Sequence, residues 1–240
     1  MTMVTLLLIR GVVSAFQGVL WDLPLALVPV LFMWAPVWWL TWRGEDPDRY
    51  PLAVPGLDER QAWGAAAAWG LGLGLAILVP YVGVYHLWQT ALLPEIMDAV
   101  CDLDVRSACG EALRARGFEP AWRFPAEPLK LVAYHLFFVA IPEELYYRGW
   151  VQSRLDEQWA PRWRIAGATL GPGWLATSLI FALGHSVVLF QWWHLAIFVP
   201  SLLFGWLRAR TGGVLAGAFF HAWCNVLVAF LDVAWGVAPP

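Results

Sequence analysis

Two long stretches without charge restrict the fold of this chain more than any other feature of its sequence. Residues 62–93 and residues 165–207 contain no Asp, Glu, Lys or Arg. The second stretch has 43 residues, enough for two helices that each cross the hydrocarbon core of a bilayer with about 20 residues. Charged residues make up only 14% of the chain, compared with about 25% in soluble domains. The sequence therefore predicts an integral membrane protein whose surroundings are the lipid bilayer.

The predicted fold is all-α, a polytopic bundle of about seven transmembrane helices. We expect these helices at 4–21, 24–42, 62–87, 129–150, 173–190, 192–208 and 213–234. Arg10 lies in the middle of the first segment, which could instead lie in the membrane interface and leave six spans. We expect one domain over residues 1–240. Residues 1–128 would provide the N-terminal helices and a polar loop, and residues 129–234 the helices that carry the chemistry.

The arginines are concentrated in segments that fall on one side of a seven-helix bundle. These segments are 43–61, 151–164 and 208–210, and positive residues predominate on the cytoplasmic side of membrane proteins. The chain has 14 arginines and one lysine, a bias typical of a GC-rich genome. We therefore expect a multi-pass protein of the bacterial inner membrane. The net charge of −3 indicates no nucleic-acid partner.

Cysteine and glycine residues allow two smaller predictions. Cys101 and Cys109 lie in the polar segment 88–128, where a disulfide could join them if the segment faces an oxidising compartment. Two free thiols are an equally good interpretation. The glycines of residues 69–78 lie inside an apolar run without a preceding strand, so we interpret them as sites of close helix packing instead of a phosphate loop.

Three groups of polar residues interrupt the predicted membrane helices. Polar groups at this depth are costly, so each requires an explanation. They are Glu143, Glu144 and Arg148, then Phe181 and His185, then His221 and Asn225. Residues four apart share a helix face, so Glu144 and Arg148 can pair while Glu143 points about 100° away. His221 and Asn225 share a face for the same reason.

The residue types in these groups are those of a hydrolytic site. Glu143, without a cationic partner on its own face, suits a general base that acts on water. The Asn225 amide can orient a water, fix a histidine tautomer or donate to an oxyanion. The ordinary interpretation is a salt-bridged helix face and histidines that bond a neighbouring helix. We apply the latter interpretation to His86, His135 and His194.

The order of the three groups is similar to that of a known family. "EELYYR", "FALGH" and "HAWCN" resemble the EExxxR, FxxxH and HxxxN/D motifs of the CAAX prenyl endopeptidase and bacteriocin-processing (CPBP, also Abi) intramembrane proteases. The resemblance covers about residues 142–225. It implies peptide-bond hydrolysis in the membrane, with Glu143, His185, His221 and Asn225 as catalytic residues. Glu144, Arg148 and Phe181 would support them.

The resemblance also bears on cofactor and substrate. The family is regarded as glutamate-dependent, so we expect no cofactor. As an alternative, Glu143, His185 and His221 could hold Zn²⁺ with an open water position. The substrate would be a membrane-anchored protein or a peptide precursor. A C-terminal sorting helix, as in myxosortase-like members, would suit a bacterial host better than a prenylated CAAX protein.

Two other functions remain open from the sequence. The first is a catalytically idle immunity or scaffold protein, although a scaffold does not need Glu143. The second is a small proton-coupled transporter in which buried Glu and His relay protons. The chain shows no inverted repeat, which is the usual mark of a transporter. It also lacks the HExxH and GxSxG motifs of zinc and serine proteases.

Overall fold

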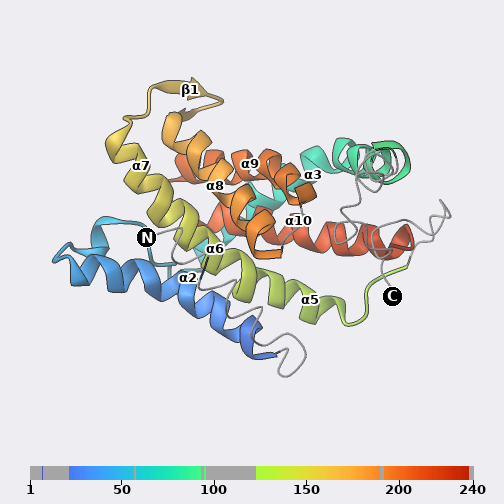
Figure 1. Cartoon of the computed structure of the whole chain (residues 1–240), viewed down its shortest axis with the longest axis horizontal. Coiled ribbons are helices and arrows are strands. Elements are labelled where there is room, and N and C mark those ends of the chain that lie inside the picture. Colours follow the sequence, from blue (N-terminus) through green and yellow to red (C-terminus); the bar gives the residue numbers. More distant parts are fainter. Residues whose placement is uncertain are drawn as a thin grey trace.

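The protein is mainly helical in the computed structural model, which describes residue 7 and residues 22–56, 58–92, 95, 123–189 and 192–237 (Figure 1). The described helices are α2 (Asp22–Trp42), α3 (Arg60–Leu87), α5 (Pro128–Tyr134), α6 (Ile141–Glu144), α7 (Ser153–Gln158), α8 (Pro172–Leu189), α9 (Phe198–Thr211) and α10 (Leu215–Ala234). A short hairpin consists of β1 (Trp163–Ile165) and β2 (Ala168–Leu170). Helix α6 lies in the middle of the molecule, where α2 and α10 both contact it.

Most of the predicted helices are present with small changes at their ends. The segments 24–42, 62–87, 173–190 and 213–234 correspond to α2, α3, α8 and α10. The segment predicted at 192–208 starts as a 3-10 helix (Trp192–Ile197) and continues as α9. The predicted helix 4–21, apart from residue 7, and the cysteines Cys101 and Cys109 lie outside the described residues.

Two described segments are long and apolar enough to cross a membrane. They are Arg60–Leu92, which includes α3, and Leu215–Ala234, which is α10. Leu27–Trp42 in α2 is a shorter apolar helix. The outer surface of α3 is strongly apolar, since Leu75 and Val79 are 68% and 81% exposed, which is typical of a surface that contacts another apolar phase. The number of spans stays a prediction.

The helix predicted at 129–150 is longer than expected and is wound irregularly. α5, α6 and α7 form one helical rod, joined by π-helical stretches at His135–Ala140 and Leu145–Gln152. The Ile141 N–H donates to the Leu136 carbonyl, five residues earlier, directly before Pro142. Proline lacks the N–H of a regular helix. π-Helical turns are rare and occur often at functional sites. The rod therefore carries its glutamates between two widened stretches.

Glycines allow α3 and α10 to pack closely, as the sequence predicts. A Cβ atom on Gly70 would lie 2.5 Å from the Ala216 carbonyl oxygen, and one on Gly74 would lie 2.6 Å from the Trp223 ring. Such distances are too short for real side chains, so both positions require glycine. Gly72, which lies between them in the sequence, has no neighbour within 4 Å. The interpretation of these glycines as sites of close helix packing is confirmed for Gly70 and Gly74 but not for Gly72.

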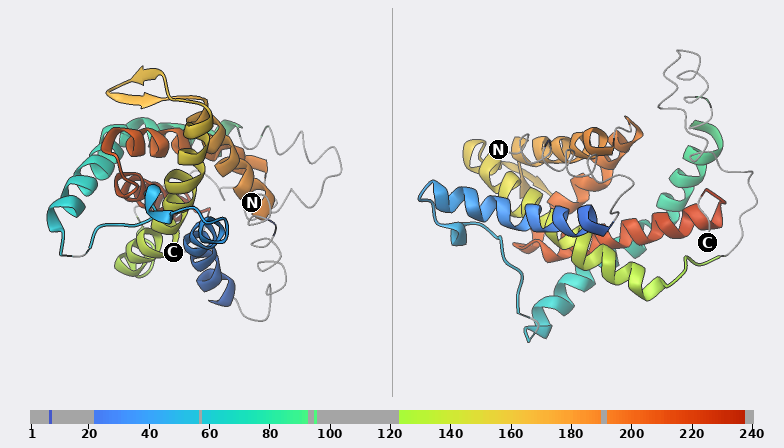
Figure 2. Two further views of the ribbon diagram at one scale, coloured as in Figure 1. Left: turned by 90° about the vertical axis from the view of Figure 1, so that its left-hand side faces the viewer. Right: turned by 60° about the horizontal axis from the view of Figure 1, so that its bottom comes forward.

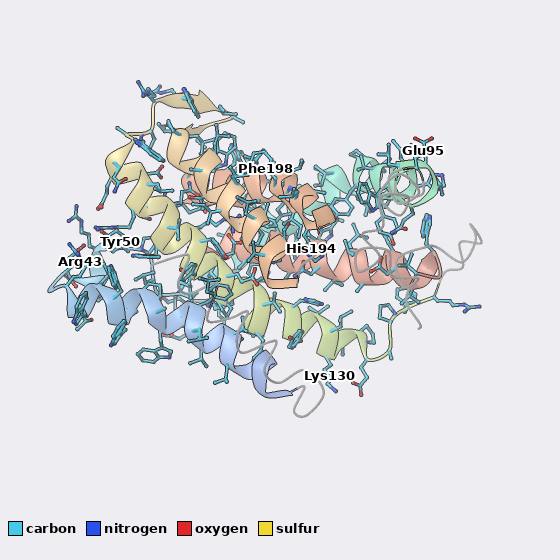
Figure 3. All side chains as sticks on the ribbon, in the orientation of Figure 1. Arg43, Tyr50, Glu95, Lys130, His194 and Phe198 are labelled. Atoms are coloured by element: carbon cyan, nitrogen blue, oxygen red, sulfur yellow. The ribbon has the colours of Figure 1, made fainter. Side chains whose placement is uncertain are left out.

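The arginine-rich segments meet at one end of the molecule. Arg154 of α7 pairs with Glu45 at 2.8 Å, and Arg208 of α9 pairs with Asp156 at 3.2 Å. Burial raises the pKa of Asp156, an effect that Arg208 opposes. Figure 3 shows Arg43 and Tyr50 together at this end, away from Lys130 at the lower edge of the view. This grouping agrees with the predicted distribution of arginine, while the assignment of this end to the cytoplasm stays a prediction.

The hairpin corrects the expectation of a purely α-helical chain. Trp163 pairs with Leu170 and Ile165 with Ala168 in antiparallel register. The turn residues Ala166 and Gly167 have φ values of 46° and 79°, the left-handed conformation that two-residue hairpin turns favour. The hairpin projects beyond the helices (Figure 2), and the Ile165 carbonyl accepts a hydrogen bond from the Trp206 indole of α9 at 3.0 Å.

Candidate active site

Four helices bring the polar residues of the predicted site into the core. α6 carries Glu143 and Glu144, α8 carries His185, α10 carries His221, and α9 closes the remaining side. Glu144 is fully buried, and Glu143 and His221 are only 9% and 4% exposed. Phenylalanines 181, 204 and 220, which are also fully buried, belong to the surrounding apolar core. The polar groups therefore meet in a place that largely excludes solvent.

The carboxylate of Glu143 faces both histidines. Its Oε2 atom lies 3.7 Å from Nε2 of His185 and 3.9 Å from Nε2 of His221. These distances are too long for direct hydrogen bonds but suit a bridging water molecule. Oε2 of Glu143 is buried and has no hydrogen-bond partner among the described residues. This oxygen can therefore accept a hydrogen bond from a water molecule or a substrate group.

The second nitrogen of each histidine is already engaged, which determines the tautomers. Nδ1 of His185 lies 3.0 Å from the Phe181 carbonyl oxygen, and Nδ1 of His221 lies 3.1 Å from Oε1 of Glu144. Both partners only accept hydrogen bonds, so Nδ1 carries the hydrogen in each ring. In the neutral rings, Nε2 is then an acceptor directed toward Glu143. Asn225 does not set either tautomer.

Glu144 and Arg148 form a fully buried ion pair. Nη1 of Arg148 lies 3.1 Å from Oε1 of Glu144, the oxygen that also accepts from His221. Nη2 of Arg148 donates to the Ser201 side chain at 2.6 Å and to the Ser201 carbonyl at 3.2 Å. Breaking one partner of such a pair leaves an unpaired buried charge, which is strongly unfavourable. Glu144 therefore connects the arginine to the histidine.

Aromatic rings enclose the arginine and the histidines. The Phe181 ring lies 4.4 Å from Cζ of Arg148 and 4.5 Å from the ring of His185. The Phe204 ring lies 5.0 Å from the same Cζ and stacks on His221 at 4.7 Å. Cation–π contacts of this kind stabilise a desolvated guanidinium. Phe181 thus supports the site with its ring as well as its carbonyl.

Asn225 lies at the margin of this cluster. It is half-buried on α10, one turn after His221. Its carboxamide makes no hydrogen bond to the other described residues. Its two N–H groups therefore have no acceptor among those residues. Its contribution to catalysis stays a proposal.

Several residues of the site escaped the sequence analysis. Ser201 and Phe204 lie on α9, in a segment whose letters look like those of any apolar helix. Gly217 is different, because it precedes His221 by one helical turn. A Cβ atom on Gly217 would lie 3.0 Å from Oε2 of Glu144. The position of Gly217 on the same face of α10 as His221 could have predicted from the sequence that another side chain packs closely there.

The remaining histidines differ in their surroundings. His86 accepts a hydrogen bond from the Trp235 indole at 3.4 Å, in agreement with a histidine that bonds a neighbouring helix. The His194 ring lies edge-on to His185, with ring centroids 6.4 Å apart, so it borders the site. No group of three or more His, Cys, Asp or Glu side chains within the described part of the chain is placed to hold a metal ion.

Gly217→Ala should destabilise the protein, although alanine normally stabilises a helix interior by about 1 kcal/mol relative to glycine. The added methyl group would lie 3.0 Å from Oε2 of Glu144, a side chain that Arg148 and His221 hold in place. Overpacking of this kind costs about 1–3 kcal/mol. We expect a lower unfolding midpoint in detergent. Gly72→Ala is the matched control, because this helical glycine has open space around it. Equal effects of both changes would contradict the contact with Glu144.

Comparison with known proteins agrees with the motif analysis. Residues 125–227 match a family model described as type II CAAX prenyl endopeptidase Rce1-like. The matched region extends from just before α5 into α10 and includes all seven proposed site residues. No curated protein and no solved structure matches the chain significantly.

Proposed function

The chain belongs, through residues 125–227, to the family of Rce1-like type II CAAX prenyl endopeptidases, and we propose that it hydrolyses a peptide bond of a membrane-anchored substrate. The family indicates a protease that is integral to the membrane. One observation supports the chemistry more than any other. Glu143 Oε2 and the Nε2 atoms of His185 and His221 converge from three helices, at 3.7 and 3.9 Å from the carboxylate.

A water molecule between Glu143 and the two histidines would be surrounded by hydrogen-bond acceptors. It would donate one hydrogen to Oε2 of Glu143 and the other to a histidine Nε2, which leaves an oxygen lone pair for the substrate carbonyl carbon. Glu143 takes the proton as the carbon–oxygen bond forms. The proton then passes to the leaving nitrogen as the peptide carbon–nitrogen bond breaks. Water is thus added across the peptide bond, and Glu143 returns to its starting state.

The tetrahedral intermediate needs a hydrogen-bond donor, and Asn225 fits that need. Glu143 and both Nε2 atoms act as acceptors in the resting site, so none of them stabilises a negative oxygen at that stage. The Asn225 carboxamide can donate to it. His221 assists later in the reaction. After the carbon–nitrogen bond has broken, Nε2 of His221 can take the proton that the new carboxyl group releases, and Glu144 at 3.1 Å stabilises the resulting imidazolium until the proton returns to solvent. Glu144 and Arg148 act by positioning His221.

The substrate class is also part of this proposal. A bacterial inner-membrane enzyme would act on a peptide precursor or on a C-terminal sorting helix, as a myxosortase-like member would. Mass spectrometry of membrane-protein termini tests it, in cells with the wild type, Glu143→Gln or a deletion. We expect a small set of proteins to lose a hydrophobic terminal segment only with the wild type. Glu127→Gln is the control, because this exposed carboxylate pairs only with Lys130.

Other results of the same experiment would favour other functions. If all strains give the same termini while Glu143→Gln rescues a deletion phenotype, the protein is an idle scaffold. If termini are unchanged and Glu143→Gln abolishes proton flux in liposomes, it is a transporter. Either result overturns the peptidase proposal.

Chelation should leave the activity unchanged to within about twofold, because the proposed mechanism needs only side-chain acid–base groups. Purified protein would be treated with 1,10-phenanthroline and its cleavage rate measured. Glu143, His185 and His221 would be the ligands if zinc were used, and the ion would then supply Lewis-acid activation of the water. Loss of activity that added zinc restores, together with bound zinc that disappears in His185→Ala, would contradict the metal-free mechanism.

A further inference from the structure

A pocket lies apart from the candidate active site. It has a volume of about 710 Å³ and lies between the segment Pro51–Pro55, the first turns of α3 and the connection from α9 to α10. None of Glu143, His185 and His221 lines it. Apolar groups form most of its wall, among them Val54, Pro55, Ala62, Ala65 and Leu215. The volume is within the range of about 300–1,000 Å³ found for sites of small ligands.

Arg210 is the one charged residue among the described residues that line this pocket. Its Cζ atom lies 5.1 Å from the centre of the Trp69 ring, which also lines the pocket. Within the described part of the chain Arg210 has no acidic partner, whereas its neighbour Arg208 pairs with Asp156. A cation next to an apolar wall suits a ligand with an anionic head and an apolar body.

The hairpin turn contacts Arg210 beside the pocket. A Cβ atom on Gly167 would lie 2.9 Å from Nε of Arg210, so the turn packs against this side chain. Arg164 lies opposite Thr169 in the hairpin, on the face away from the buried Ala168 and Leu170. The positive charge at the pocket is therefore that of Arg210.

The first turn of α10 adds backbone donors to the same place. Leu215 and Ala216 line the pocket, and the residue before them, Val214, gives no side-chain hydrogen bond to the free N–H groups of the helix. The N-terminus of a helix of 20 residues carries a partial positive charge. It therefore reinforces the preference of Arg210 for an anion.

The pocket lies at the ends of the helices that are long enough to span a bilayer. α3 begins here, α9 ends here and α10 begins here, and α3 and α10 are the described helices long enough to span a bilayer. Trp69, Trp159 and Trp163 remain 38–45% exposed. Tryptophan and arginine together are typical of the boundary between head groups and acyl chains.

We propose that this pocket binds an anionic phospholipid, with its phosphate at Arg210 and one acyl chain along the wall of Val54, Ala62, Ala65 and Leu215. The wall offers few polar side chains with which to recognise a peptide, since Thr211 is the only one besides Arg210 and the Trp69 indole. The bilayer supplies such a lipid at high local concentration. The inference needs the protein to be membrane-embedded but does not depend on its peptidase activity.

Native mass spectrometry of the purified full chain tests this site, with phosphatidylglycerol and phosphatidylcholine of identical acyl chains as the probes. We expect phosphatidylglycerol to be retained preferentially and Arg210→Gln to weaken its binding about tenfold, the loss of one charge-assisted contact. Ala65→Phe should weaken both lipids by filling the pocket. Arg43→Gln is the matched control, because it removes a charge at the same end but outside the pocket. Unfolding midpoints would show that each variant is folded.

Three results would overturn the proposal. The first is equal retention of both lipids, or binding that does not change in Arg210→Gln. The second is competition by glycerol 1-phosphate as strong as by phosphatidylglycerol, which would indicate an anion site without a lipid chain. The third is displacement by a peptide with a free C-terminal carboxylate but not by its amide, which would make the pocket a substrate site. Because lipid binding is the readout, an inactive enzyme would not affect the outcome.

Discussion

Glu143→Gln is expected to lower the rate of peptide cleavage by about 10³-fold or more, because glutamine has the same shape but cannot take a proton from water. The same change should leave the protein as stable as the wild type, or more stable. Oε2 of Glu143 has no hydrogen-bond partner among the described residues, so the substitution removes a buried carboxylate without breaking a direct hydrogen bond. Active-site residues with buried polar groups commonly lower the stability of a protein, and replacing them then raises stability while activity is lost.

Parallel measurements on the purified protein would check this expectation. Cleavage of an identified substrate gives the rate, and the unfolding midpoint in detergent gives the stability. Glu144→Gln is the informative comparison, because Glu144 bonds both Arg148 and His221 and its loss should reduce stability as well as activity. A Glu143→Gln protein that retains a tenth of the wild-type rate would rule out Glu143 as the base.

Arg148→Met is expected to cost about 3–5 kcal/mol of stability, the usual result of removing one partner of a buried ion pair. The guanidinium is fully buried and its loss leaves the Glu144 carboxylate with only His221 as a partner. The double variant Glu144→Gln/Arg148→Met should recover part of this loss, because it leaves no lone buried charge. Chemical unfolding in detergent micelles would measure the free energy of unfolding of Arg148→Met and of the double variant relative to the wild type.

The loss of stability in Ser201→Ala is the reference with which the loss in Arg148→Met should be compared. This substitution of Ser201 removes a single hydrogen bond of 2.6 Å to the guanidinium, and hydrogen bonds to charged groups contribute about 1.5–3 kcal/mol. If Arg148→Met cost no more than Ser201→Ala, the pair with Glu144 would contribute little. The site would then depend on packing around the phenylalanines instead of on charge.

The sequence was most informative where helical spacing and the cost of buried charge act together. Glu144 and Arg148 are four residues apart, so their pairing follows from helix geometry. The same reasoning placed Glu143 on another face, and the structure directs it toward two histidines from other helices. That three separate helices meet at one depth could not be calculated from local spacing. It was inferred from the similar depth of the three polar groups in the predicted membrane helices, and the family's order of motifs agreed with it.

Contacts made by ordinary residues were beyond a local analysis. Ser201 and Phe204 have no pattern that distinguishes them from packing residues, and their roles depend on the approach of α9 to α6. The hairpin at residues 163–170 was missed because its strands are three residues long and its second half lies inside an uncharged run that favours a helical interpretation. The tautomer of His221 depends on Glu144, which lies 77 residues earlier in the chain.

The π-helical stretches around α6 bear on how relatives of this chain should be aligned. A π-helical turn contains one residue more than the α-helical turn that it replaces. A relative that lacks one residue within 135–140 could therefore keep the whole rod, with α5 turned relative to the carboxylates. A gap at that point in an alignment would signify a change of winding instead of a lost motif. In such an alignment, the residues before Pro142 and the residues after it are best aligned independently of each other.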